Sequence, residues 1–93
     1  MKLYYSNEFL GDIFNISVEG MWVNAKITPS TNIDKFKKFF AAIVDEDNEF
    51  EEGNYNEEWL DDNNWYIVDA ENRKKGIYIP AVYSDWEISW RWR

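Results

Sequence analysis

Residues 13–28 constrain the fold most, because they alternate in the pattern of two strands joined by a tight turn. Glu19-Gly20 suits a two-residue hairpin turn, in which glycine takes a positive φ. Side chains alternate between the two faces of a strand, so a turn there gathers apolar residues on one face. The sequence therefore predicts an antiparallel hairpin with one apolar face. The expected pairs are Val18 with Met21, Ile16 with Val23, and Phe14 with Ala25.

A helix is expected after this hairpin. Pro29 ends the second strand, and the hydroxyl of Thr31 is placed to cap a first helical turn. A run of apolar residues at helical spacing follows, which predicts a main helix over about residues 31–46. Its apolar face is expected to cover the apolar face of the hairpin. The residues of this stripe are Ile33, Phe36, Phe40, Ile43 and Val44.

The last third of the chain alternates as strands again, and a short strand is also expected at residues 2–5. The expected elements of the last third are a short helix at about residues 57–62, a strand at residues 65–69, a loop at residues 70–76, and a second hairpin of residues 77–83 and 86–92 that turns at Ser84-Asp85.

These elements predict a single small α+β domain over residues 1–93. Its antiparallel sheet is expected to consist of two hairpins plus an extra strand, packed against the main helix and the short helix. The chain is too short for a second domain. It has no cysteine, so its stability is expected to rest on the packing of six Trp, six Tyr and six Phe rather than on disulfides.

Negative charge is concentrated in residues 45–62, where ten of the eighteen residues are Asp or Glu and none is Lys or Arg. A dense carboxylate surface attracts a basic partner, although such charge also serves solubility alone. Aromatic residues in the same segment are candidate anchors, because they supply contact energy that charge does not. The candidate partner-binding residues are Asp45, Glu46, Asp47, Glu49, Phe50, Glu51, Glu52, Tyr55, Glu57, Glu58, Trp59, Asp61 and Asp62.

The composition argues against several classes of function. A net charge of −8 disfavours binding to nucleic acid or to an anionic membrane, because both would repel the chain. Without His and Cys the usual catalytic triads are excluded, and the sequence has no glycine-rich phosphate loop. We therefore expect no enzymatic activity, no catalytic residue and no cofactor. The absence of a signal-peptide pattern and of an apolar run near ~20 residues predicts a cytoplasmic location, while the oligomeric state stays open.

A calcium site of the EF-hand type is a further alternative for the acidic segment. Such a loop requires glycine at its sixth position. A loop that starts at Asp45 places Phe50 there, and one that starts at Asp47 places Glu52 there. Both registers fail, and only an irregular cation site stays open.

Two aromatic residues outside the expected core indicate a different class of function. Trp22 is expected on the polar face of the first hairpin and Tyr78 on the outer face of the second. Coplanar, exposed rings would favour a carbohydrate-binding module. We expect instead that both rings pack beneath a loop or over the second face of the sheet.

In being small, acidic, free of cysteine and rich in Trp, the chain is similar to many immunity proteins of bacterial toxin systems and to some phage-encoded inhibitors. This resemblance of type implies a non-enzymatic protein that neutralises a basic partner, such as a nuclease toxin. A small-ligand or carbohydrate-binding module is one alternative. A DNA mimic that inhibits nucleic-acid-processing machinery is another.

Overall fold

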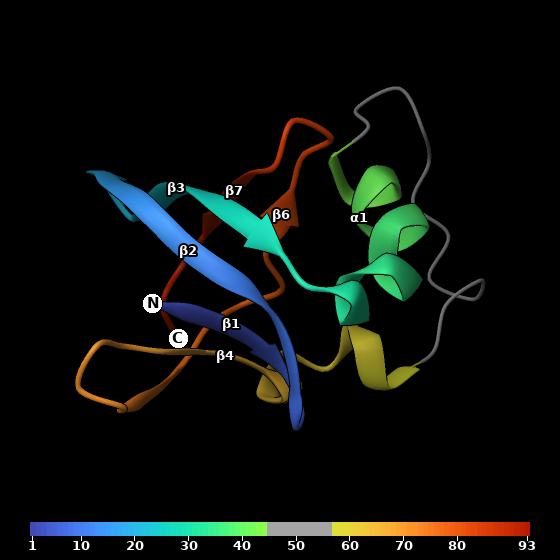
Figure 1. Cartoon of the computed structure of the whole chain (residues 1–93), viewed down its shortest axis with the longest axis horizontal. Helices are drawn as coiled ribbons and strands as arrows, with labels where there is room; N and C mark the ends of the chain where they lie inside the picture. Colours follow the sequence, from blue (N-terminus) through green and yellow to red (C-terminus); the bar gives the residue numbers. More distant parts are fainter. Residues whose placement is uncertain (45–56) are drawn as a thin grey trace.

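Residues 1–44 and 57–93, which the computed structural model describes, form a seven-stranded antiparallel sheet with a helical layer beside it (Figure 1). The strands lie in the order β5-β4-β1-β2-β3-β7-β6. Their bounds are β1 Lys2–Tyr5, β2 Glu8–Glu19, β3 Trp22–Pro29, β4 Trp65–Val68, β5 Lys74–Gly76, β6 Ala81–Val82 and β7 Glu87–Trp90.

The helical elements lie between β3 and β4 in the chain. The predicted main helix is present within the described residues, and two short 3-10 turns take the place of the predicted short helix. The main helix begins as a 3-10 helix, and its predicted residues 45–46 lie outside the described part. Ser30, not Thr31, holds the N-cap position, and its hydroxyl donates to the Phe9 carbonyl at 2.6 Å instead of capping the helix. The elements are η1 Thr31–Phe36, α1 Lys37–Val44, η3 Glu57–Leu60 and η4 Asp62–Asn64.

The predicted α+β class with an antiparallel sheet is confirmed, but the protein is richer in sheet than expected, and two hairpins plus one strand do not describe it. β1 lies between β4 and β2, so a strand from the start of the chain joins the two halves of one sheet. Residues 74–76, predicted as loop, form β5 beside β4. They pair because a turn at Asp69 reverses the chain immediately after β4.

The first hairpin forms, with its turn one residue later than predicted. Glu19 lies opposite Trp22, so Gly20 and Met21 are the two turn residues, and Gly20 has a φ of 60°. Glycine at the first central position is what a type II′ hairpin turn requires. Val18 consequently lies opposite Val23, and the predicted apolar pairs are wrong.

A β-bulge in β2 changes the register again before the core is reached, so that Phe14 lies opposite Lys26 and not opposite the predicted Ala25. Asn15 takes a φ of 53°, a conformation that Asn tolerates better than most residues, and the pairing shifts between Phe14 and Ser17. Beyond the bulge the hairpin tip extends away from α1 (Figure 1). Its apolar residues are therefore exposed, contrary to prediction: Phe14, Ile16, Val18 and Met21.

The second predicted hairpin is much shortened. β6 and β7 pair over two positions, one of which sets Val82 opposite Ile88. The predicted two-residue turn is wrong, because the pairing leaves residues 84–86 as the connection. Trp86, the last of them, has a φ of 63°, as the third residue of such loops commonly does.

An aromatic cluster joins the helical elements to the sheet. The ring centroid of Phe36 lies 4.7 Å from that of Trp59 and 5.3 Å from that of Trp65. Trp65 is fully buried, and its indole N–H donates to the Trp59 carbonyl at 2.9 Å, so its polar atom is satisfied. The cluster consists of Tyr5, Phe36, Phe39, Phe40, Trp59 and Trp65.

Gly11 marks a very close approach of β2 to β3. A Cβ atom at this position would lie 2.6 Å from the carbonyl oxygen of Thr28 and 2.8 Å from Cγ1 of Ile27. Both distances are well inside van der Waals contact, so the backbones approach this closely only because the residue is glycine.

Candidate functional site

A polar groove of about 720 Å³ opens beside the turn between β1 and β2, and we call it the acidic groove. Three parts of the chain form it: the β1–β2 turn, η1, and the 3-10 turns before β4. The backbone N–H of Ser6 donates to the Asn64 carbonyl at 2.8 Å and fixes the turn against η4. Its principal lining residues are Tyr5, Glu8, Lys35, Glu58, Trp59 and Asp61.

The electrostatics of the acidic groove act on the Tyr5 hydroxyl. Burial raises the pKa of Tyr5 above its usual value, and the nearby carboxylates of Glu58, Glu8 and Asp61 raise it further. Lys35 forms an ion pair with Glu8 across the mouth of the groove. The contribution of the carboxylates is smaller than that of burial, and its sign is the one that would favour the ammonium or guanidinium of a partner.

The described part of the predicted binding segment contributes unequally to this groove. Glu57, Glu58 and Asp61 are exposed. Trp59 is half-buried in the aromatic cluster, and the Asp62 carboxylate accepts the backbone N–H of Ile79 at 2.9 Å, so both hold the fold together. The other candidates lie outside the described residues: Asp45, Glu46, Asp47, Glu49, Phe50, Glu51, Glu52 and Tyr55.

Sequence reasoning missed three residues of the acidic groove, namely Tyr5, Glu8 and Lys35. They precede the acidic segment and carry no local motif. Tyr5 and Glu8 reach the groove because β1 pairs with β4, which sets Tyr5 opposite Trp65 directly after η4. Lys35 reaches it from η1 through its ion pair with Glu8. No local pattern in the sequence reveals these contacts.

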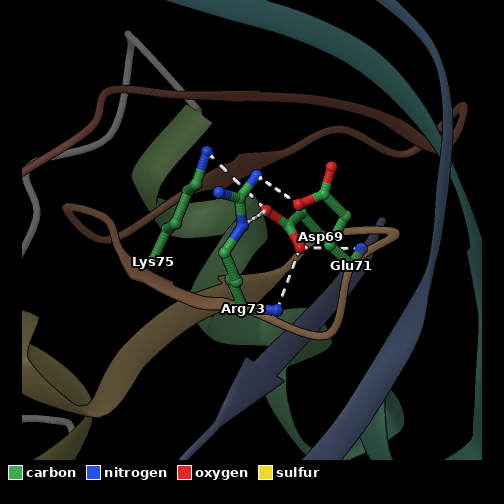
Figure 2. A network of polar contacts seen from close by, with 4 residues as sticks. All are labelled: Asp69, Glu71, Arg73 and Lys75. Carbon is green, nitrogen blue, oxygen red and sulfur yellow. Dashed lines mark hydrogen bonds and ion pairs between the residues drawn. The ribbon is translucent and has the colours of Figure 1, made fainter.

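A second polar cluster, at the turn between β4 and β5, is structural (Figure 2). One carboxylate oxygen of Asp69 accepts the backbone N–H groups of Glu71 and Arg73, both at 2.9 Å. Its other oxygen accepts from Arg73 Nε at 3.0 Å, with Lys75 Nζ 3.8 Å away. The side chain of Asp69 is only 8% exposed, so its oxygens are committed to closing this turn.

Stability should depend on pH through Asp69. The hydrogen bond from the Arg73 backbone N–H is the main cause that holds the pKa of Asp69 below its ordinary 3.8. Burial opposes this effect, while the Glu71 N–H and the Arg73 guanidinium add to it. A lowered folded-state pKa stabilises the protein fully above the unfolded value and progressively less as pH falls through the folded value. We expect Asp69→Asn to lower the free energy of unfolding at neutral pH. The difference in this free energy between the variant and the unmodified protein should narrow below pH 3.8.

Urea unfolding of both proteins at about pH 7 and about pH 2 measures this difference. Glu71→Gln is the control, because its exposed ion pair with Arg73 contributes little and the Asp69 hydrogen bonds remain. An Asp69→Asn deficit of equal size at both pH values would contradict the assignment.

At the far end of β2 the aromatic residues Trp22 and Tyr78 are exposed, by 44% and 42% respectively, contrary to the expected packing beneath a loop or over the sheet. Arg91 lies between them. Its Cζ is 5.1 Å from the Trp22 ring centroid and 5.0 Å from that of Tyr78. The two rings therefore flank a guanidinium and do not form one open platform.

The described residues contain no group of three or more acids arranged to hold a metal ion. Nor does any helix in residues 1–44 and 57–93 combine the length and apolarity needed to cross a bilayer. The sequence matches no family model, no curated protein and no solved structure. Function must therefore be argued from the chain's own surfaces.

Proposed function

We propose that this chain is a non-enzymatic protein that binds and neutralises a basic partner, most concretely an immunity protein for a nuclease toxin. The acidic groove carries the proposal: the carboxylates of Glu8, Glu58 and Asp61 all act on Tyr5 there. The lining of the groove carries three carboxylates, those of Glu8, Glu58 and Asp61, and one ammonium, that of Lys35. Its formal charge is therefore negative, which suits a basic side chain.

The distribution of charge along the chain supports the same proposal. Six of the eighteen acids lie within residues 45–56, which contain no Lys or Arg, so most of the net charge of −8 belongs to the stretch that leads into η3. Two of the groove acids, Glu58 and Asp61, follow this stretch closely in sequence. Concentrated charge of one sign raises the association rate of an oppositely charged partner by about 10- to 1,000-fold.

A nuclease is a suitable partner because its active site must attract phosphate and is therefore basic. An inhibitor that occupies such a site needs no catalytic group of its own. The DNA-mimic alternative relies on the same charge but requires carboxylates spaced regularly like phosphates. The short 3-10 turns η3 and η4 offer little support for such an array.

The exposed rings of Trp22 and Tyr78 favour a carbohydrate-binding module as the second candidate. A sugar would stack on an open aromatic face, whereas each of these rings already has a cation over it. A glycan array tests this candidate directly. Binding that is lost in Trp22→Ala would support it, and an array without hits would remove it.

The leading proposal predicts a specific effect of three charge neutralisations in the described acids. The triple variant Glu57→Gln, Glu58→Gln, Asp61→Asn should associate at least about tenfold more slowly with its basic partner at low ionic strength. The first partner to test is a basic nuclease encoded beside the gene for this chain. Stopped-flow association at low and high ionic strength and inhibition of the nuclease are the measurements.

A triple variant with the same change in net charge provides the control: Asp12→Asn, Glu71→Gln, Glu87→Gln. Asp12 and Glu87 lie on β2 and β7, and Glu71 lies in the turn between β4 and β5; none lines the acidic groove, so the control should retain most of the association rate. Equal rates for both triples would show that net charge alone matters. Unchanged association of the first triple at low ionic strength would overturn the acidic groove as the binding surface.

A further inference from the structure

A second surface lies at the other end of β2 from the acidic groove, at the tip of the β2–β3 hairpin. The antiparallel register that sets Val23 opposite Trp90 continues to Trp22 and Arg91, and the Tyr78 N–H donates to the Arg91 carbonyl at 3.0 Å. Trp22, Arg91 and Tyr78 are thus direct neighbours across three adjacent segments. Their side chains share one face, and the guanidinium is stacked between two rings.

Arg91 differs from the other two arginines of the chain in what it binds. Arg73 pairs with Asp69 and Glu71, and the Arg93 side chain donates to the backbone carbonyls of Ile77 and Trp65. Arg91 meets no oxygen acceptor among the described residues. Its Nη1 contacts only the thioether sulfur of Met21, at 3.9 Å, and its buried Nε has no hydrogen-bond partner in the described part of the chain.

Such a guanidinium is prepared for an anionic ligand. Both rings lie within cation–π distance of the guanidinium, which leaves the Nη–H donors at its planar edge for a ligand. That edge matches the two oxygens of a carboxylate. A ligand carboxylate would give the Nη donors the oxygen acceptor that they lack among the described residues.

The surroundings of Arg91 are apolar. A hollow of about 440 Å³ beside it is lined by Val18, Met21, Tyr78 and Trp92. Val18 is 67% and Met21 69% exposed, so this apolar area faces solvent widely and does not enclose a small molecule. Sites for small ligands usually bury most of the ligand surface, whereas an extended peptide can cover a shallow area such as this one.

We propose that the hairpin tip binds an acidic side chain of a protein partner. The partner's carboxylate pairs with Arg91 between Trp22 and Tyr78, and apolar residues beside that carboxylate rest on Val18, Met21 and Trp92. Arg91, the group that meets the ligand, has the opposite charge to the acids of the acidic groove. The inference is therefore independent of the proposed function, and the chain has two surfaces that select partners of opposite charge.

Chemical-shift titration of the full chain tests the proposal, with the Trp indole N–H and Arg Nε–H signals as reporters. The probes are an acetylated, amidated Leu-Glu-Leu peptide and its Leu-Gln-Leu counterpart, which differ only in the carboxylate. The glutamate peptide should bind at least about tenfold more tightly and should shift the signals of Trp22 and Arg91. Equal binding of the two peptides to the unmodified protein would overturn the proposal.

Three variants and a third probe locate the effect. Arg91→Gln should reduce binding of the glutamate peptide to that of the glutamine peptide, and Arg91→Lys should recover only part of it, because an ammonium lacks the planar fork. Lys38→Gln on α1 changes the net charge equally and should leave binding unchanged. Free 3-phenylpropionate should bind more weakly than the peptide. Equally tight binding of this small carboxylate would overturn the assignment to a protein partner.

Discussion

Replacing Trp65 by alanine is expected to destabilise the protein more than any other single change in its core. Trp65 is fully buried, stacks against Phe39 with ring centroids 6.3 Å apart, and donates to the Trp59 carbonyl. Truncating a buried Trp typically costs about 3–5 kcal/mol, and a domain of this size has a total stability of roughly 5–14 kcal/mol. We therefore expect the melting temperature to fall by about 15 °C or more.

The same substitution at an exposed position separates burial from residue type. Trp22→Ala removes a ring that is 44% exposed and one cation–π contact, so it should cost only about 1 kcal/mol. Urea unfolding followed by circular dichroism compares the two, because either variant alters the Trp fluorescence. Similar losses for Trp65→Ala and Trp22→Ala would contradict the location of the core.

Gly11→Ala is expected to have the next largest effect, although it adds only one methyl group. The new Cβ would lie 2.6 Å from the Thr28 carbonyl oxygen, which is backbone and cannot rotate away. β2 and β3 would have to separate where their hairpin meets the core. Overpacking of this kind typically costs about 1–3 kcal/mol, and we expect the upper part of that range.

Gly20→Ala is the matched control, because a Cβ there meets nothing within 4 Å and only the positive φ opposes it. That strain costs about 1–2 kcal/mol. Chemical denaturation should rank Gly11→Ala as the more destabilising change. The reverse order would indicate that β2 and β3 can move apart at Gly11 without consequence.

Local patterns in the sequence predicted most of the strands and the main helix. The strand registers depended on single residues, and local patterns do not identify those residues. Both Glu19-Gly20 and Gly20-Met21 place a glycine in a hairpin turn, and the apolar alternation favours the former. The positive φ of Gly20 at the first central position selects the latter. The bulge at Asn15 then shifts the register by one residue, and nothing in the apolar alternation indicates it.

The candidate site was predictable where it follows from composition and unpredictable where it follows from pairing. The acids Glu57, Glu58 and Asp61 belong to a conspicuous acidic stretch. Tyr5 and Glu8 join them only because β1 pairs with β4. Likewise, the alternation of the C-terminal strand indicates that Arg91 faces outward. Its position between Trp22 and Tyr78 depends on two tertiary features, namely that β7 lies beside β3 and that the Tyr78 N–H donates to the Arg91 carbonyl.

The position of β1 also determines the order in which the protein can fold. β1, β2 and β3 are consecutive and can pair as soon as they are synthesised, but β1 also requires β4, where Lys2 lies opposite Val68. A contact so distant in sequence imposes a large loop-closure entropy on folding and slows it. On the ribosome, β1 therefore lacks its second neighbour, and Tyr5 lacks Trp65, until β4 emerges. We expect a single slow folding step that coincides with the burial of Trp65.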